Sequence, residues 1–230
     1  FHTHTFPEKI AAIALHRLQT MSHNAVFTDG TVAGLQESMR IAGVTHSVIL
    51  PVVTNPEKAT HINDISIAHT EDDGLIYFGG IHPDSEDYMA ELNRIKKLGL
   101  PGIKLHPDYQ GVMIDDERYI NIIRYADELG LIILVHAGID IGLPDPVHCP
   151  PDKMKKVIDE IKPKKLVLAH MGGWKQWEEV YGLLAGEDVY FDISFTFGYI
   201  EEQMFLAILK KHGWIYPTMF FIFVSFKVSL

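Results

Sequence analysis

The stretch Leu131-Ile-Ile-Leu-Val135-His136 consists of five apolar residues followed at once by a histidine. An apolar run of this length is typical of a strand that is buried on both faces. Three other apolar runs end in the same way, at His82, His106 and His170. The segments between such runs carry apolar residues at helical spacing, as residues 154–161 do. This alternation predicts βα units and a parallel sheet.

The strand segments predict one α/β domain over residues 1–230, folded as a (β/α)8 TIM-type barrel. Seven strands are predicted, at residues 2–4, 47–53, 75–81, 102–105, 131–135, 166–169 and 189–193. An eighth strand would have to lie in residues 214–230, an atypical Phe-rich tail with no room for an eighth outer helix. We therefore expect the last βα unit to be truncated or aberrant. The tail should insert as the eighth strand or become buried in a subunit contact.

Composition narrows the range of partners. The 230 residues are 47% hydrophobic, which is enough for a large core. The net charge of −10, from 20 basic and 30 acidic residues, disfavours nucleic acid and anionic membranes as partners. The single cysteine, Cys149, excludes an intrachain disulfide. No signal peptide opens the chain, and the apolar run at residues 219–224 is shorter than the roughly 20 residues of a membrane helix. We expect a cytoplasmic protein with a small-molecule substrate; a homo-oligomer remains open.

Four histidines form the candidate metal site. His2 and His4 lie two residues apart in the first predicted strand, so their side chains point to the same face. His136 and His170 follow the fifth and sixth strands. Since the carboxyl ends of all barrel strands open onto one face, these residues converge although they lie far apart in sequence. Imidazole is the commonest metal ligand among side chains.

For four other candidate site residues the sequence allows two interpretations each. His82 and His106 also end strands, but either could simply cap a strand or bond a loop carbonyl. Lys104 shares a face with His106, which suits an anionic substrate or a buried ion pair. Asp192, at the end of the seventh strand, could point into the barrel mouth or accept hydrogen bonds from loop amides.

The remaining histidines are less promising. His148 beside Cys149 falls short of a zinc ligand set. The others lie on predicted helices or loops and are interpreted as solvated: His16, His23, His46, His61, His69 and His212.

Seven segments together resemble a known family: FHTHTFP, residues 29–52, GGIHP, GIKLHP, LVHAG, LAHMGG and VYFDIS. From Phe1 to about Gly213 the chain resembles the amidohydrolase superfamily, specifically the amidohydrolase-2 group of metal-dependent TIM-barrel hydrolases. The resemblance implies that His2, His4, His136 and His170 bind a divalent metal, usually zinc. It also implies hydrolysis, or decarboxylation in a minority of relatives, of a small carboxylate-, amide- or lactone-bearing substrate.

One part of the family pattern is absent. The family ends its eighth strand with an aspartate that handles the proton of the attacking water, whereas residues 214–230 contain no Asp or Glu. Asp192 is the local stand-in for a catalytic carboxylate, and activity is expected to be impaired. Lys104, His106 and His82 are the predicted substrate-binding residues.

Three other functions remain open on the sequence. They are a decarboxylase of the same superfamily, a PHP-type or TatD-like phosphoesterase, and an inactive barrel that keeps its metal. Net charge and Lys104, which stands where TatD-like proteins are expected to offer a glutamate, count against the phosphoesterases.

Overall fold

A computed structural model describes residues 2–69 and 74–213 of the chain. Its strands are parallel throughout and follow one another in sequence order. Together they form the curved wall of the barrel, which is called the wall below. One sheet has the order β1-β2-β3 and the other β4-β5-β6-β7-β8. The strands are β1 (His2–Thr3), β2 (Ser47–Ile49), β3 (Leu75–Tyr77), β4 (Gly79–Gly80), β5 (Gly102–Leu105), β6 (Ile132–Val135), β7 (Leu166–Leu168) and β8 (Tyr190–Phe191).

The third predicted strand accounts for both β3 and β4. Its first half pairs with β2 and its second half pairs with β5. The ladder changes partner at Phe78, whose amide donates to the carbonyl of Ile49 at 3.0 Å. The seven predicted strands are thus the seven strand segments of the wall, which confirms the α/β barrel-type fold. Within the described residues no ladder joins β8 to β1, so the barrel is not formally closed. The predicted eighth strand in residues 214–230 lies outside the described residues.

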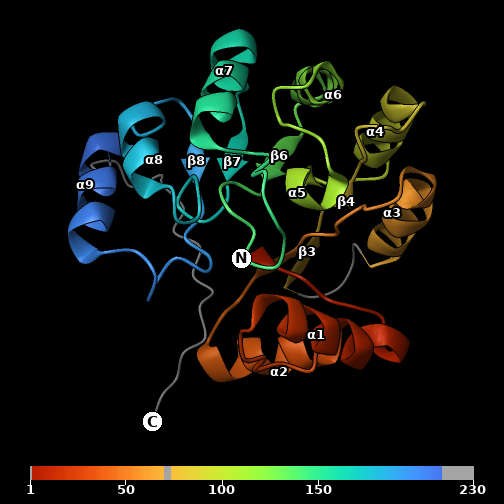
Figure 1. The fold of residues 1–230 in the computed structure, drawn as a ribbon. Helices are drawn as coiled ribbons and strands as arrows, with labels where there is room; N and C mark the ends of the chain where they lie inside the picture. The colour runs from red at the N-terminus through yellow and green to blue at the C-terminus, as the bar shows by residue number, and fades with distance from the viewer. Residues whose placement is uncertain (1, 70–73, 214–230) are drawn as a thin grey trace.

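Helices surround the strands. The helices α3, α4 and α6 to α9 form an arc, the short α5 lies inside it, and α1 and α2 lie together on the opposite side (Figure 1). They are α1 (Glu8–Ser22), α2 (Val32–Ala42), a 3-10 turn (Pro56–Lys58), α3 (Ala59–Ala68), α4 (Tyr88–Lys97), α5 (Pro107–Gln110), α6 (Glu117–Glu128), α7 (Pro151–Ile161), α8 (Trp177–Leu183) and α9 (Glu202–His212). None of the helices in the described ranges is long and apolar enough to cross a membrane.

Local signals explain several helix ends. Thr31 caps α2 by accepting a hydrogen bond from the Gly34 amide, and Asp116 caps α6 in the same way through the Arg118 amide. Gly43 and Gly213 end α2 and α9 with positive φ angles of 67° and 91°, which glycine adopts without steric cost.

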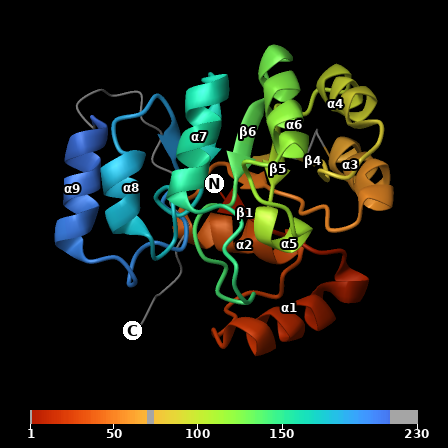
Figure 2. The same cartoon turned by 45° about the horizontal axis from the view of Figure 1, so that its top comes forward.

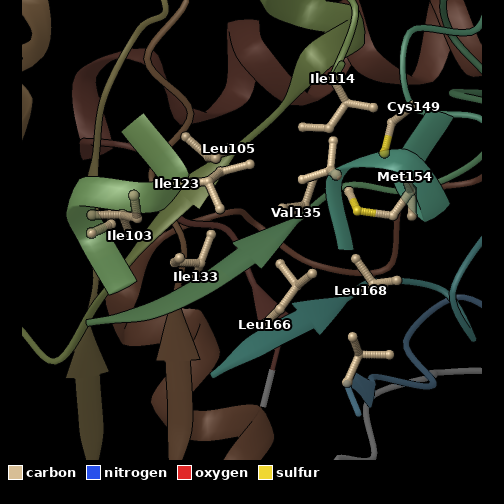
Figure 3. Close-up of a cluster of buried hydrophobic side chains, with 14 of the residues drawn as sticks. Ile103, Leu105, Ile114, Ile123, Ile133, Val135, Cys149, Met154, Leu166 and Leu168 are labelled. Carbon is tan, nitrogen blue, oxygen red and sulfur yellow. The ribbon is translucent and has the colours of Figure 1, made fainter. Parts of the chain in front are cut away.

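Alternation along the strands divides the buried residues between two faces. Ile103 and Leu105 of β5 point outward and pack with β6, β7 and the covering helices (Figure 3). Lys104 lies between them in sequence and therefore points to the inside of the wall. A smaller apolar cluster, separate from the outer one, consists of Val48, Leu50, Phe78, Leu134, Val167 and Ala169.

His212 corrects one expectation. It is half-buried at the end of α9 and stacks on Phe191 of β8, with ring centroids 4.2 Å apart. Its Nε2 donates to the carbonyl of Val189 at 3.0 Å, and its Nδ1 accepts from the Gly186 amide at 3.1 Å. The other five histidines that were interpreted as solvated are exposed: His16, His23, His46, His61 and His69.

Candidate metal centre

Five histidines meet at the carboxyl end of the strands. Neighbouring rings lie 5.0 Å apart for His2 and His4, 5.3 Å for His2 and His170, and 4.9 Å for His136 and His170. His106 stacks on His136 with centroids 4.1 Å apart and ring planes only 7° from parallel. Figure 2 shows β1 inside the ring of helices. The barrel geometry therefore brings together the four predicted metal ligands and His106.

Three of these histidines have tautomers that their surroundings determine. His4 Nδ1 lies 2.7 Å from the carbonyl of Leu50, and His170 Nδ1 lies 2.9 Å from the carbonyl of Ser194. A carbonyl oxygen only accepts, so both Nδ1 atoms must carry the hydrogen. His2 Nδ1 faces the Asp192 carboxylate at 2.7 Å and donates in the same way. All three residues therefore present a bare Nε2 when neutral.

Two of these bare nitrogens face each other. His2 Nε2 and His4 Nε2 are 3.1 Å apart, although neither has a hydrogen to share. Two lone pairs at that distance repel unless a cation lies between them. Nitrogens that bind one tetrahedral zinc ion at about 2.0–2.1 Å stand roughly 3.3 Å apart, which is close to the spacing seen here. The donor set therefore fits a divalent metal ion.

A second nitrogen pair has the same spacing. His170 Nε2 lies 3.1 Å from His136 Nδ1, so a fourth nitrogen is available beside the other three. Burial keeps these rings neutral: desolvation lowers the pKa of His2, His136 and His170 below its usual range, and the charge of Lys104 acts in the same direction. Neutral imidazole is the form that binds metal.

Asp192 is fully buried and its two oxygens are occupied by protein donors. Oδ2 accepts from His2, while Oδ1 accepts from the backbone amides of His170 at 3.2 Å and Ser194 at 2.9 Å. Burial alone would raise the pKa of Asp192, but attraction to His2 and the hydrogen bond from it hold that pKa well below its usual value. Asp192 thus both points into the mouth and bonds loop amides. Its geometry is that of a carboxylate that orients a metal-binding histidine.

Lys104 is buried among these groups with 1% exposure, and its Nζ has no hydrogen-bond partner in the described part of the chain. Of the two interpretations left open by the sequence, a buried ion pair is therefore not formed. Desolvation lowers the pKa of Lys104 to about 7, although Asp192 and Asp140 oppose the shift. An unpartnered buried amine of this kind is suited to receive an anionic group of a substrate.

The hydrogen bond of His82 lies within its own turn and does not involve the five clustered histidines. Its Nδ1 accepts a hydrogen bond from the amide of Asp84 at 3.1 Å, within the turn that follows β4. This contact matches the strand-capping interpretation. Its substrate-binding role remains a prediction.

Two carboxylates in the mouth were not predicted. Asp140 Oδ2 lies 3.4 Å from His106 Nε2 and 3.9 Å from His136 Nε2. Asp108 Oδ2 also lies 3.9 Å from His136 Nε2, while Asp108 Oδ1 accepts from the amide and Nδ1 of His148 at 3.0 and 3.1 Å. Asp108 and Asp140 follow strand-ending histidines by two and four residues, which is the only sequence signal that could have identified them.

The turn after β7 holds His170 in place through an unusual backbone. His170 and Met171 have φ angles of 58° and 57°, in the left-handed region that residues with a side chain seldom occupy. The indole of Trp177 donates to the His170 carbonyl at 3.1 Å, and the Met171 amide donates to the Asp192 carbonyl at 2.6 Å. Such strain persists where the surroundings enforce it, and it is often found at functional sites.

Comparisons with known proteins agree with the predicted family and barrel-type fold. A family model described as Amidohydrolase matches residues 1–221. No curated protein matches the chain. An uncharacterised TIM-barrel protein from Bordetella bronchiseptica is 16% identical, with a TM-score of 0.66, and the match covers 86% of this chain and 76% of that one.

Two other solved structures have related folds. A 5-carboxyvanillate decarboxylase from Novosphingobium aromaticivorans, solved with manganese and 4-hydroxy-3-methoxy-5-nitrobenzoic acid, is 16% identical with a TM-score of 0.64, and the match covers 92% of this chain and 82% of that one. A probable 2-pyrone-4,6-dicarboxylic acid hydrolase from Acinetobacter baumannii is 15% identical with a TM-score of 0.56, with 92% and 76% covered. At this level of identity the likeness establishes the fold alone.

Proposed function

The chain belongs to the amidohydrolase family, and from that premise we propose that it is a metal-dependent hydrolase of a small carboxylate-, amide- or lactone-containing substrate. The observation that carries the proposal is the pair of bare nitrogens of His2 and His4, 3.1 Å apart. His136 and His170 would complete the ligand set for one divalent ion, with zinc as the first candidate.

When bound, such an ion supplies Lewis-acid polarisation of a carbonyl oxygen and lowers the pKa of a water molecule. The chain's own residues prepare the site. The carbonyls of Leu50 and Ser194 and the carboxylate of Asp192 hold three imidazoles with Nε2 facing inward. Lys104 would bind an anionic oxygen of the substrate. In this proposal Asp192 is a positioning residue rather than a proton acceptor, because its oxygens are already occupied.

His106 would face the substrate from the far side of His136, as the stacking of the two rings suggests. The cytoplasmic location, the small-molecule partner and the lack of nucleic-acid or membrane partners remain predictions from composition, and a homo-oligomer remains open.

Decarboxylation is the second candidate. The similar structures include a decarboxylase that was solved with manganese and a benzoic acid ligand. A buried amine such as Lys104 would suit a carboxylate substrate in either reaction. The products separate the two reactions, because decarboxylation releases carbon dioxide and hydrolysis consumes water. Zinc and manganese are separated by elemental analysis.

The test begins with the metal content of the purified chain, measured by mass spectrometry. We expect about one divalent ion per chain, and we expect it to be lost in the double variant His136→Ala/His170→Ala. The matched control is His16→Ala/His61→Ala, which removes two exposed histidines. A chain without metal, or metal that survives the first double variant, would refute the assignment.

Activity assays follow with a panel of esters, lactones, amides, aromatic carboxylates and phosphodiesters. Hydrolysis of a member of the first three classes is the expected result. Turnover of phosphodiesters alone would favour a PHP-type or TatD-like enzyme. A chain that binds metal and turns over no member of the panel would favour the inactive barrel.

A further inference from the structure

We propose that Gln110 is a positioning residue that directs His106 toward the substrate, because its side chain ties the backbone of His106 to the ends of two neighbouring strands. The proposal rests on the proposed function, in which His106 faces the substrate. Gln110 is not among the metal-binding or substrate-binding groups described above.

A single helical turn brings Gln110 back over His106. Helix α5 begins directly after His106 with a proline at its first position, and it ends at Gly111, whose φ angle of 65° is typical of a glycine after a helix. Residues four apart in such a turn lie next to each other. The backbone amide of Gln110 accordingly donates to the carbonyl of His106 at 3.0 Å.

The side-chain amide of Gln110 is buried and makes four hydrogen bonds. The residue is only 6% exposed. Its Nε2 donates to the carbonyls of Val53 at 2.8 Å and of Ile81 at 2.7 Å. Its Oε1 accepts from the backbone amide of His106 at 3.0 Å and from the hydroxyl of Tyr119 at 2.6 Å. Since a carboxamide offers two hydrogens and two lone pairs, this one is fully bonded.

The partners determine which end of the amide is the oxygen. Carbonyl oxygens only accept, so the atom that faces Val53 and Ile81 must be the nitrogen. The backbone amide of His106 only donates, so the atom that faces it must be the oxygen. A flipped amide would lose three of the four hydrogen bonds, because only the hydroxyl of Tyr119 can both donate and accept. The side chain is therefore held in one orientation.

These hydrogen bonds link three strands beyond the point where the ladder ends. The ladder between β4 and β5 ends with Gly80. Ile81 directly follows β4, His106 directly follows β5, and Val53 lies four residues beyond the end of β2. Buried backbone groups without partners cost free energy, and Gln110 provides a partner for one such group from each strand. It thereby holds the three strand ends at fixed separations.

The consequence for His106 is a fixed side-chain direction. Its backbone amide bonds the side chain of Gln110, and its carbonyl bonds the backbone amide of the same residue. The ring then stacks on His136, with centroids 4.1 Å apart and planes 7° from parallel. The bond to Ile81 acts on the residue directly before His82. One side chain thus holds the backbone beside both histidines that were predicted to bind substrate.

The variant Gln110→Met tests the proposal, because methionine has a similar length and makes none of the four hydrogen bonds. A second variant, Gln110→Glu, keeps an acceptor for His106 but places an oxygen against the carbonyls of Val53 and Ile81. The matched controls are Gln36→Met and Gln36→Glu, which make the same changes at an exposed position of α2.

The first readout is the nuclear magnetic resonance spectrum of the metal-free full chain. In the wild type and both controls, we expect side-chain amide hydrogens of Gln110 that exchange slowly with solvent. We also expect nuclear Overhauser contacts between carbon-bound ring hydrogens of His106 and His136, with the signals of His106 identified by their loss in His106→Gln. Both Gln110 variants should lose these ring contacts.

Two outcomes of this experiment would overturn the proposal. One is rapid exchange of the Gln110 amide hydrogens in the wild type, a measurement that needs no variant to fold. The other is persistence of the ring contacts between His106 and His136 in either Gln110 variant.

The second readout is the kinetics of the zinc-loaded chain with the ester, lactone or amide that the wild type hydrolyses. Gln110→Met should lower kcat/KM roughly 10–100-fold at unchanged zinc stoichiometry, since small displacements of a group that orients a substrate have effects of this size. In the His106→Gln background the same change should lower kcat/KM less than about threefold, because Gln110 acts through His106. Equal losses in the two backgrounds would contradict a role through His106.

The two proposals fail in different ways. A wild-type chain that binds no metal removes the proposed function, yet its spectra still show whether Gln110 holds His106 against His136. If Gln110→Met keeps both the ring contacts and the kcat/KM of the wild type, the role of Gln110 is refuted and the proposed function stands.

Discussion

Replacing Lys104 with methionine is expected to stabilise the metal-free protein, and to do so more strongly at pH 7 than at pH 9. Lys104 is 1% exposed and its amine has no partner within the described residues. Methionine has a similar length and shape but no charge to desolvate. The same change should weaken binding of an anionic substrate, because buried polar groups without partners are often kept for function at a cost in stability.

The magnitude follows from the two protonation equilibria. Desolvation lowers the pKa of Lys104 from 10.5 to about 7. Between these values the unfolded chain binds the proton and the folded chain does not, so the unfolding free energy falls as the pH falls from 10.5 to 7, by about 1.4 kcal/mol per pH unit. Methionine removes that loss. The gain in unfolding free energy is on the order of 4 kcal/mol at pH 7 and on the order of 2 kcal/mol at pH 9.

Urea unfolding monitored by circular dichroism measures the effect at pH 7, 8 and 9, with chelator present. The control is Lys96→Met, which removes an exposed positive charge from α4 and should show no comparable trend. Burial raises the pKa of Cys149 and Tyr119, but both proteins contain these groups and their titration cancels in the difference. A gain that is equal at pH 7 and pH 9, or no gain at either pH, would refute the reasoning.

Three further predictions concern the same site and the core. Asp192→Asn should weaken metal binding 10–100-fold and lower the unfolding free energy by about 1.5–3 kcal/mol, because the buried hydrogen bond from His2 to a charged acceptor is lost; metal competition and urea unfolding measure the two effects, and unchanged values of both would contradict the positioning role. Acid should destabilise the metal-free chain below about pH 6.5: desolvation lowers the pKa of His2 and His136, so the unfolded chain takes up protons first, at about 1.4 kcal/mol per pH unit for each site. Unfolding curves at pH 7, 6 and 5 measure this loss, and a flat profile would be evidence against neutral buried imidazoles. Leu105→Ala should cost about 2–5 kcal/mol in urea unfolding, because its fully buried side chain would leave a cavity, and a loss below about 1 kcal/mol would mean that the wall relaxes around it.

Much of the fold was predictable from local pattern. Buried parallel strands need uninterrupted apolar runs, and helices that cover a sheet need apolar residues on one face, so the alternation could be seen directly in the sequence. The four metal-ligand candidates were predictable for a related reason. A histidine directly after a strand must lie at the carboxyl-end face of the barrel, whatever the details of packing. The match of residues 1–221 to the family agrees with the predicted family and fold, while the four ligands stay a prediction.

Contacts between segments that are separate in the sequence were not predictable. The third strand segment pairs with β2 before Phe78 and with β5 after it, a change of partner that no residue pattern signals. His212 was interpreted as solvated because its helix position gives no sign that Phe191, 21 residues earlier in sequence, packs against it. Asp140 was missed because a loop carboxylate becomes part of the site only when the loop folds back over His106.

The sequence by itself determined which side chains are available and on which face of the wall they lie, because strand position and side-chain alternation are local properties. The tertiary structure alone decided what each side chain does. Asp192 bonds His2, which is 190 residues away, and Lys104 is left without a partner in the described chain. The tautomers of His2, His4 and His170 depend on acceptors from other segments. Hydrogen bonds and desolvation act over a few ångströms, and only the folded chain brings these groups within that range.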